Sequence, residues 1–275
     1  MQPNKLTTTL AAALTVAALA RPVFAGPVED AVVEYARGDY ATALRFFRPT
    51  AEQGDARAQF GLASMYLEGK GVPQDYGQAL KWFRSAAAKG FSGAQYYLGY
   101  MYERGKGVTQ DYTAALRWYR LAAEQGLVIA QSALGFMYCH GNGVTQDYAE
   151  ALRWYRKAAD EGEAGAQSEI GVMYNDGQGV TQDHAEALKW FRKAAEQGEA
   201  RGLFNLGIAY SKGTGVPQDY VQAHMWFSLA ALLASDTEDR EGATKARDHL
   251  ASAMSTGQVA EAEKLAREWW PKPER

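Results

Sequence analysis

Cys139 and His140 are the one adjacent pair of residues in this sequence that could supply both a nucleophile and metal ligands. A structural zinc site needs about four ligands, whereas two adjacent residues rarely direct both side chains to one ion. The other histidines, His184, His224 and His249, stand in different parts of the chain. We expect a structural role for Cys139. Metal binding, and redox sensing by a thiol of lowered pKa, are the alternatives.

The sequence lacks the short motifs of common catalytic and nucleotide-binding sites. It contains no Gly-x-x-x-x-Gly-Lys-[Ser/Thr], His-Glu-x-x-His, Gly-x-Ser-x-Gly or Ser-x-x-Lys stretch. Gly-x-Gly pairs such as Gly105-Lys-Gly107 recur. They follow a helical pattern instead of a strand, which indicates a loop closure and not a phosphate cradle. We therefore predict a protein that is not an enzyme and has no cofactor and no metal.

Basic residues three apart recur through the chain and could form a stripe on successive helices. The pairs are Arg45/Arg48, Lys81/Arg84, Arg117/Arg120, Arg153/Arg156 and Lys189/Arg192. Acids stand four residues after the second base in most copies, at Glu52, Glu124, Asp160 and Glu196, on the same helix face. One interpretation is a solvated, charge-balanced face. The other is a surface for an acidic partner, with Arg84, Arg120 and Arg156 as its contacts.

Aromatic residues in the middle of the chain are the second set of candidate binding residues. Tyr96, Tyr97, Tyr100 and Phe136 occupy places where the equivalent residues of other copies are small or polar. Tyrosine and phenylalanine often anchor a bound peptide. The alternative is that some of these rings fill the core between helices.

These candidates are embedded in a pattern that repeats every 36 residues, Asp-Tyr-x-x-Ala-Leu-x-Trp-[Phe/Tyr]-Arg-x-Ala-Ala. Its first residues are Asp39, Asp75, Asp111, Asp147, Asp183 and Asp219. A second pattern, Ala-Gln-x-x-Leu-Gly-x-Met-Tyr-x-x-Gly-x-Gly-Val, follows each time and is clearest at 94–108 and 130–144. Repetition at this period is typical of a solenoid. We predict five repeats and a degenerate sixth, at 39–74, 75–110, 111–146, 147–182, 183–218 and 219–254.

Each repeat is predicted to form two helices, which we call helix A and helix B. The aspartate is a natural N-cap for helix A, and a Gln or Glu three residues later suggests a capping box. A glycine such as Gly99 recurs in the middle of helix B, where it costs about 1 kcal/mol relative to Ala. That cost indicates close contact with a neighbouring helix. The tryptophans of helix A are expected to pack between adjacent repeats.

The two ends of the array are predicted to be capping helices, as solenoids require. Residues 26–38 contain a short helix at about 28–37. Residues 255–275 contain a final helix at about 258–270, with Ser255 and Gln258 as its capping box and Trp269-Trp270 covering the open core. The predicted fold is an all-α, right-handed α-solenoid of stacked antiparallel helix pairs, with about 14 helices and almost no strand.

The N-terminus predicts export. Lys5 precedes an apolar stretch, and Val23-Phe24-Ala25 provides a cleavage site before Gly26, so residues 1–25 are interpreted as a signal peptide. The mature protein is expected in the periplasm or outside the cell, as a monomer without a transmembrane segment. A single cysteine excludes an intramolecular disulfide. The net charge of −3, without blocks of like charge, gives no indication of nucleic-acid binding.

The two patterns resemble the Sel-one-like repeat family, a branch of the tetratricopeptide superfamily. Leu-Gly-x-Met-Tyr and Gly-x-Gly-Val at a 36-residue period carry this resemblance over residues 39–218. It implies binding of a protein or peptide, as an adaptor in the bacterial cell envelope, on the concave face of the solenoid. The alternatives are an envelope hydrolase whose site the spacing hides, and a structural or regulatory subunit of a larger complex.

Overall fold

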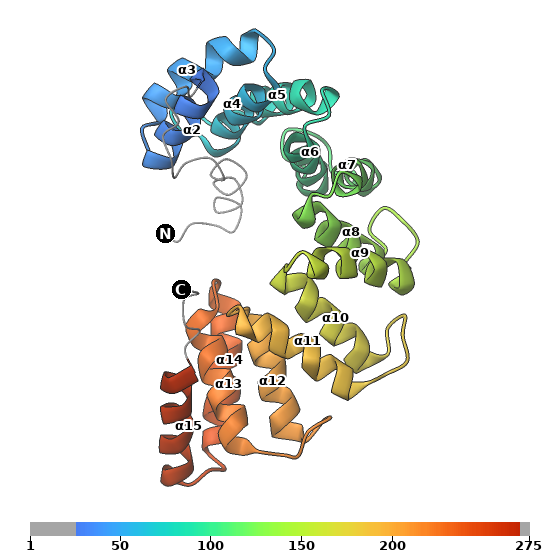
Figure 1. Cartoon of the computed structure of the whole chain (residues 1–275), viewed down its shortest axis with the longest axis vertical. Helices are drawn as coiled ribbons and strands as arrows, with labels where there is room; N and C mark the ends of the chain where they lie inside the picture. Colours follow the sequence, from blue (N-terminus) through green and yellow to red (C-terminus); the bar gives the residue numbers. More distant parts are fainter. Residues whose placement is uncertain (1–25, 270–275) are drawn as a thin grey trace. The chain divides into compact units, whose positions relative to one another are not determined.

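The computed structural model describes residues 26–269, and within this range all regular structure is α-helical (Figure 1). Fourteen helices lie in the described range, which confirms the predicted all-α solenoid of stacked helix pairs. They are α2 (Pro27–Arg37), α3 (Tyr40–Glu52), α4 (Ala56–Glu68), α5 (Tyr76–Ala88), α6 (Ser92–Arg104), α7 (Tyr112–Glu124), α8 (Val128–His140), α9 (Tyr148–Asp160), α10 (Ala164–Asp176), α11 (His184–Glu196), α12 (Ala200–Lys212), α13 (Tyr220–Leu233), α14 (Thr237–Ala251) and α15 (Thr256–Trp269).

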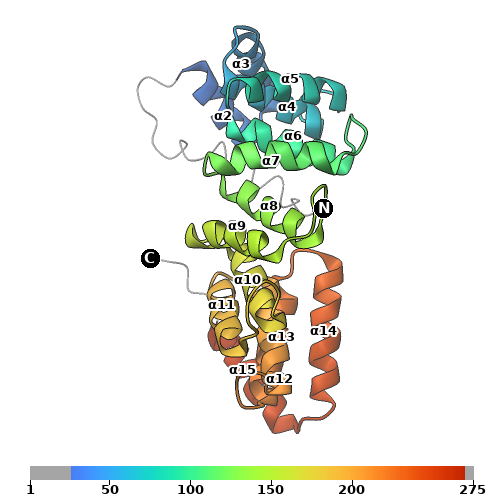
Figure 2. The same cartoon turned by 90° about the vertical axis from the view of Figure 1, so that its right-hand side faces the viewer.

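The described chain divides into two compact units, and each is considered by itself. The first reaches Ala130 and includes Asn142–Thr145; the second comprises Gln131–Gly141 and the chain from Gln146 onward. In the second unit, both views show α12, α13 and α14 side by side (Figure 1 and Figure 2). The odd-numbered helices α3 to α13 are helices A, and the even-numbered α4 to α12 are helices B. The predicted signal peptide lies outside the described residues.

An aspartate caps the N-terminus of every helix A, as predicted. In α5, for example, the Asp75 carboxylate accepts a hydrogen bond of 3.0 Å from the backbone N–H of Gln78. The reciprocal half of the predicted capping box does not form in α9, where Glu150 instead pairs with Arg153 at 2.7 Å. The backbone N–H of Asp147 already donates to the Tyr138 carbonyl at 2.9 Å, so it has no need of the Glu150 carboxylate.

The core depends on one aromatic ring per repeat, the residue that follows the tryptophan of helix A. These rings are between 0% and 4% exposed, and they are Phe47, Phe83, Tyr119, Tyr155, Phe191 and Phe227. From the third repeat on, each ring lies against the mid-helix glycine of the preceding helix B. A Cβ added to Gly99 would stand 2.6 Å from the Tyr119 ring, and one added to Gly171 would stand 2.5 Å from the Phe191 ring. This confirms the close helix contact that the glycines predicted.

The tryptophans are less buried than predicted. Trp154 and Trp226 are both 8% exposed, whereas Trp82, Trp118 and Trp190 are half-buried. The ammonium of Lys157 lies over the Trp154 ring, 4.2 Å from its centroid, so one face of that indole is covered by a long polar side chain. The aromatic residue that follows each tryptophan in helix A is more deeply buried, so it contributes more to the packing between repeats than the tryptophan does.

A buried glutamine of helix B accepts a hydrogen bond from an exposed glutamine of the next repeat. The Gln125 amide donates to Gln95 Oε1 at 2.6 Å, and Gln197 makes the same bond to Gln167 at 2.9 Å. In both cases a glutamine that ends one helix A reaches the glutamine in the first turn of the preceding helix B. A polar group that is buried and hydrogen-bonded avoids the cost of desolvation without a partner. These bonds fix the register of one repeat on the next.

Both ends are closed as the sequence suggested. At the N-terminal end, the Tyr35 hydroxyl of α2 donates to Glu68 at 2.9 Å. At the C-terminal end, Ser255 and Gln258 form the predicted reciprocal capping box, with bonds of 2.9 and 3.3 Å. The Trp269 ring packs edge-on against Trp226, with centroids 5.0 Å apart. Trp270 lies outside the described residues.

Two equivalent tyrosines differ in one hydrogen bond, which gives a matched pair of predictions. The buried Tyr119 hydroxyl donates to Glu103 at 2.6 Å, and burial together with this carboxylate raises its pKa well above the usual value. Cys139 stands at the place of Glu103 in the next repeat, and the buried Tyr155 hydroxyl has no hydrogen-bond partner among the described residues. We expect Tyr119→Phe to lower the free energy of unfolding by about 1–3 kcal/mol, because it removes a charged hydrogen bond.

Tyr155→Phe is expected to leave the free energy of unfolding unchanged or to raise it by about 1 kcal/mol, because it removes a buried hydroxyl without a partner. Phenylalanine already occupies the position of Tyr155 in four of the six repeats, so a ring without the hydroxyl fits between the helices there. Urea denaturation followed by circular dichroism measures both variants. If Tyr119→Phe and Tyr155→Phe lowered the free energy of unfolding equally, the hydrogen bond of Tyr119 to Glu103 would not be the stabilising difference between the two tyrosines.

Candidate binding surfaces

Tyr96 and Tyr97 are not exposed anchors, and that part of the candidate site is corrected. Tyr96 is 9% exposed and Tyr97 is 2% exposed. The Tyr97 ring stacks on Phe83 at 5.2 Å, with 6° between the ring planes, and the Tyr96 ring lies 5.4 Å from Tyr119. Burial also raises the pKa of both phenols. The alternative interpretation, that these rings fill the core, is the one the structure supports for both residues.

The residue at the place of Tyr96 differs between copies of the repeat, which suggested an exposed binding position. The structure shows that these differences arise from packing. In the first, third and fourth repeats, the residue at the place of Tyr96 touches the residue just before the next helix B. In the first repeat this is an aromatic contact, with the rings of Phe60 and Phe91 5.0 Å apart. In the fourth, the Ser168 hydroxyl donates to Glu199 at 2.9 Å. The two partners change together from apolar to polar, so the differences between copies reflect paired packing and not ligand recognition.

Tyr100 and Phe136 retain accessible ring surface. Tyr100 is half-buried in the first unit, with the Lys106 ammonium 5.0 Å from its ring centroid. Phe136 is 41% exposed in the second unit, and its ring stacks on His140 at 4.1 Å. They remain candidate contacts for a partner.

The arginines of the basic stripe are held by tyrosines of the next helix, which was not foreseen. Arg84 donates to the Tyr102 hydroxyl at 2.8 Å, and Arg156 donates to the Tyr174 hydroxyl at 2.7 Å. Arg192 has the same relation to Tyr210 at 3.4 Å. Each tyrosine follows its arginine by 18 residues and belongs to the Leu-Gly-x-Met-Tyr motif. The constant spacing was the available signal, but sequence alone does not show that the two side chains converge.

The predicted charge balance with acids four residues later is therefore wrong for Arg156 and Arg192. Arg156 is bonded to Tyr174 and not to Asp160, because the side chain leans across to helix B instead of along its own helix. The ion pairs between described residues include none with Arg84, Arg156 or Arg192. In two repeats it is the first base of the pair that forms an ion pair with an acid. Arg153 pairs with Glu150 at 2.7 Å, and Lys189 pairs with Glu186 at 2.7 Å. Arg120, the remaining predicted contact, is exposed on α7.

The Cys139-His140 pair does not converge on a common point in the structure. His140 Nδ1 lies 2.9 Å from the Phe136 carbonyl, and its ring covers Phe136. Cys139 is half-buried, and burial and then Glu169 raise the pKa of its thiol. A raised pKa means less thiolate at neutral pH, which favours an unreactive thiol over a nucleophile. Within the described residues, no group of three potential metal ligands comes together.

His224, one of the histidines far from Cys139 in the sequence, is a buried titratable residue. It stands on α13 where the five preceding helices A have Leu, and it is 3% exposed. It borders a cavity of about 420 Å³ together with Arg247 and Glu263. Burial and then Arg247 lower its pKa, so this histidine is held in its neutral form. Ser228 Oγ lies 3.5 Å from His224 Nδ1, but the Ser228 hydroxyl donates to the His224 carbonyl at 2.8 Å, so this neutral imidazole in a core position is best explained as packing.

Comparison with known proteins assigns the repeats. The family model described as Sel1 repeat matches six successive segments, at residues 34–55, 56–91, 92–127, 128–163, 164–199 and 200–235. The chain belongs to the Sel1 repeat family. Repeats of this family generally mediate protein–protein interaction. A search of curated proteins gives no match. Within residues 26–269, no helix combines the length and the apolar character needed to cross a bilayer.

One solved structure agrees with this Sel1 repeat assignment, and two others are similar to the chain at lower TM-scores. A Sel1 repeat protein from Oxalobacter formigenes is 33% identical, with a TM-score of 0.74; the match covers 88% of this chain and 99% of that one. A putative Sel1 repeat protein from Klebsiella pneumoniae is 21% identical, with a TM-score of 0.48 and coverage of 74% and 97%. A protective antigen of uropathogenic Escherichia coli with the same fold is 26% identical, with a TM-score of 0.44 and coverage of 89% and 76%.

Proposed function

We propose that this Sel1 repeat protein is an exported, non-enzymatic scaffold of the bacterial cell envelope that binds a protein or peptide partner carrying acidic groups. The observation that carries the proposal is the set of exposed arginines held by tyrosine hydroxyls, Arg84, Arg156 and Arg192. They recur at fixed places of helix A and form no ion pair with another described residue. Export is supported by the signal-peptide pattern of residues 1–25.

An arginine held in this way is suited to recognition of carboxylates. The guanidinium carries five N–H donors, and a single bond to a tyrosine hydroxyl leaves several of them directed outward. The tyrosine limits the rotamers of the long side chain, which reduces the entropy lost when a partner binds. Carboxylate pairs with arginine are often bidentate and roughly twice as strong as neutral hydrogen bonds. Tyr100 and Phe136 would add apolar contact area beside such charges.

Charge reversal at these arginines tests the proposal. A partner is first captured by cross-linking in an envelope extract of the source organism and identified. Its binding to the triple variant Arg84→Glu, Arg156→Glu, Arg192→Glu is then measured by surface plasmon resonance at several salt concentrations. We expect the association rate to fall by about tenfold or more at low salt, because reversed charges repel an acidic partner. N-terminal sequencing of the native protein is expected to start at Gly26.

The matched control is the triple variant Arg45→Glu, Lys81→Glu, Arg117→Glu. It changes the net charge by the same amount at exposed positions one turn earlier on helices A. If both triple variants weaken binding equally, the effect is one of net charge, and the specific role of the tyrosine-held arginines is rejected. If neither variant changes binding, the acidic partner is rejected.

A further inference from the structure

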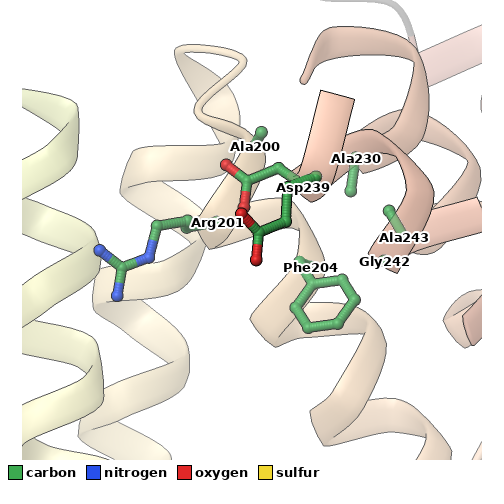
Figure 3. Close-up of a pocket in the computed structure, with 8 residues that line it drawn as sticks. Ala200, Arg201, Phe204, Ala230, Asp239, Gly242 and Ala243 are labelled. Carbon is green, nitrogen blue, oxygen red and sulfur yellow. The ribbon is translucent and has the colours of Figure 1, made fainter. Parts of the chain in front are cut away.

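The second unit contains a cavity of about 240 Å³ between α12, α13 and α14. Phe204 of α12, Ala230 of α13 and Gly242 and Ala243 of α14 line it, with Glu238 and Asp239 at the start of α14. In Figure 3 the Phe204 ring and the labelled alanines surround the space, and the Arg201 side chain points away from Phe204. Pockets for small ligands have volumes of roughly 300–1,000 Å³, so this cavity suits a single side chain better than a cofactor.

The first cause of the cavity is a shift in the repeat register. Phe204 stands at the place of Phe60 and Ser168, which are covered by Phe91 and Glu199 just before the next helix B. A constant period would place Ser235 over Phe204. However, α13 is 14 residues long where the preceding helices A have 13, and α14 begins only at Thr237. The covering residue is thus displaced, and Phe204 stays half-buried.

The second cause is the loss of a large side chain. Each helix B from α4 to α12 buries one large aliphatic residue in its middle, at Leu62, Leu98, Leu134, Ile170 and Leu206. Because α14 begins 37 residues after α12, the residue of α14 at the place of Leu206 is Ala243, which is 2% exposed, and Gly242 stands beside it. A Cβ added at Gly242 would have no atom within 4 Å. Gly242 is exposed, so this space opens to solvent, and Ala243 leaves only a methyl group where the other helices B bury a large aliphatic side chain.

The charges beside the cavity specify its occupant. Arg201 is neutralised by an ion pair with Glu169. Glu238, in contrast, belongs to none of the ion pairs between described residues, and it lies next to Asp239 in the first turn of α14. Negative charge is favoured at the N-terminus of a helix, where the positive end of the helix dipole lies. A side chain that enters the cavity thus meets apolar walls, and the residue next to it meets the carboxylate of Glu238.

We propose that this cavity is a docking site for a segment of a partner protein in which an aliphatic or aromatic side chain stands next to a Lys or Arg. The apolar side chain replaces the missing aliphatic residue against Phe204 and Ala243, and the basic residue pairs with Glu238. This inference rests on the proposed function as a binding scaffold. The protein would then have two contact surfaces: an acidic one at the cavity for a basic residue of the partner, and a basic one at the tyrosine-held arginines for its acidic groups.

The test uses the protein from Gly26 to Arg275 and a random dodecapeptide library displayed on phage. Peptides that bind wild type are sequenced and synthesised with a fluorophore, and their Kd values are measured by fluorescence polarisation. We expect selected peptides to carry an apolar residue adjacent to Lys or Arg. For these peptides, we expect Gly242→Leu to raise Kd by at least about tenfold, because the added side chain fills the cavity. Glu238→Lys is expected to raise Kd by about fivefold or more, most strongly at low salt.

Two control variants separate the cavity from general effects. Gly257→Leu adds the same side chain at an exposed helical glycine of α15, where a Cβ meets nothing closer than 3.9 Å. Glu261→Lys reverses an exposed acid of the same helix. Both are expected to leave Kd unchanged. Gly242→Leu keeps the fold, because it replaces a helical glycine with a better helix former.

The outcomes distinguish the two proposals. Selected peptides that bind Gly242→Leu as tightly as wild type reject the cavity as their site, while binding of peptides by the scaffold stands. Peptides that are acidic and lose affinity only in the Arg84, Arg156, Arg192 triple variant also reject the cavity and support the arginine surface. A library that yields no binder contradicts peptide binding itself and removes both proposals.

Discussion

Phe83→Ala is expected to lower the free energy of unfolding by about 3–5 kcal/mol, the usual cost of removing a fully buried aromatic ring. Phe83 is 0% exposed, and the centroid of its ring lies 5.7 Å from that of Phe60 and 5.2 Å from that of Tyr97. A cavity at this place separates the first repeat from the second, and Ala cannot restore the contacts of the ring. Urea denaturation followed by circular dichroism gives the change in stability.

The adjacent Trp82 provides the control for this prediction. Its indole is larger than the Phe83 ring but only half-buried, with the Lys81 ammonium 5.5 Å from the ring centroid. Trp82→Ala is therefore expected to cost less than half as much as Phe83→Ala. Since solenoid stability is a sum of repeat and neighbour terms, hydrogen exchange in Phe83→Ala should accelerate first in α4, α5 and α6. A larger loss in Trp82→Ala would show that the tryptophan row carries the stack.

Gly171→Ala is expected to lower the free energy of unfolding by about 1–3 kcal/mol, although Ala is normally the better helix former by about 1 kcal/mol. The added Cβ would stand 2.5 Å from the Phe191 ring, closer than any ordinary contact. Phe191 is 4% exposed and packed from all sides, so the ring cannot move away without opening the interface between α10 and α11. Thermal and urea denaturation both measure the change.

A second glycine and a double-mutant cycle isolate the clash. Gly242→Ala, at a helical glycine with open space around it, should raise the free energy of unfolding by up to about 1 kcal/mol. In the background Phe191→Ala, the Gly171→Ala change should no longer be destabilising, because the ring that it meets is gone. If Gly171→Ala still lowers the free energy of unfolding in the Phe191→Ala variant, contact with the Phe191 ring is not the reason that residue 171 must be glycine.

The helices could be predicted because their signals are local and repeated. Asp75 and Gly90 mark the two ends of one helix A, and Gly105 ends the helix B that follows; the structure reproduces these limits. Gly99 predicted a close approach, because a glycine in the middle of a helix is unfavourable without one. The capping box of Ser255 and Gln258 was equally visible, since it needs only a spacing of three residues.

The candidate binding residues were harder to predict, because exposure depends on what lies opposite. Tyr97 and Tyr100 are three residues apart on one helix, yet Tyr97 is 2% exposed while Tyr100 is half-buried. Arg156 has an acid four residues away on its own helix, but its hydrogen bond goes to Tyr174 on another helix. Both outcomes are set by the angle and distance between neighbouring helices, which no spacing within one helix contains.

The amino-acid sequence by itself determined the repeat, its 36-residue period, the alternation of two helices and the aspartates and glycines that begin and end them. These features follow from backbone preferences and from periodicity, so they can be read from residues close together in the chain. Only the tertiary structure decided which rings are core, what holds the arginines, and where the register shift between α13 and α14 leaves Phe204 uncovered. The physical reason is that burial and hydrogen bonding between helices depend on side chains that meet only after the repeats have stacked.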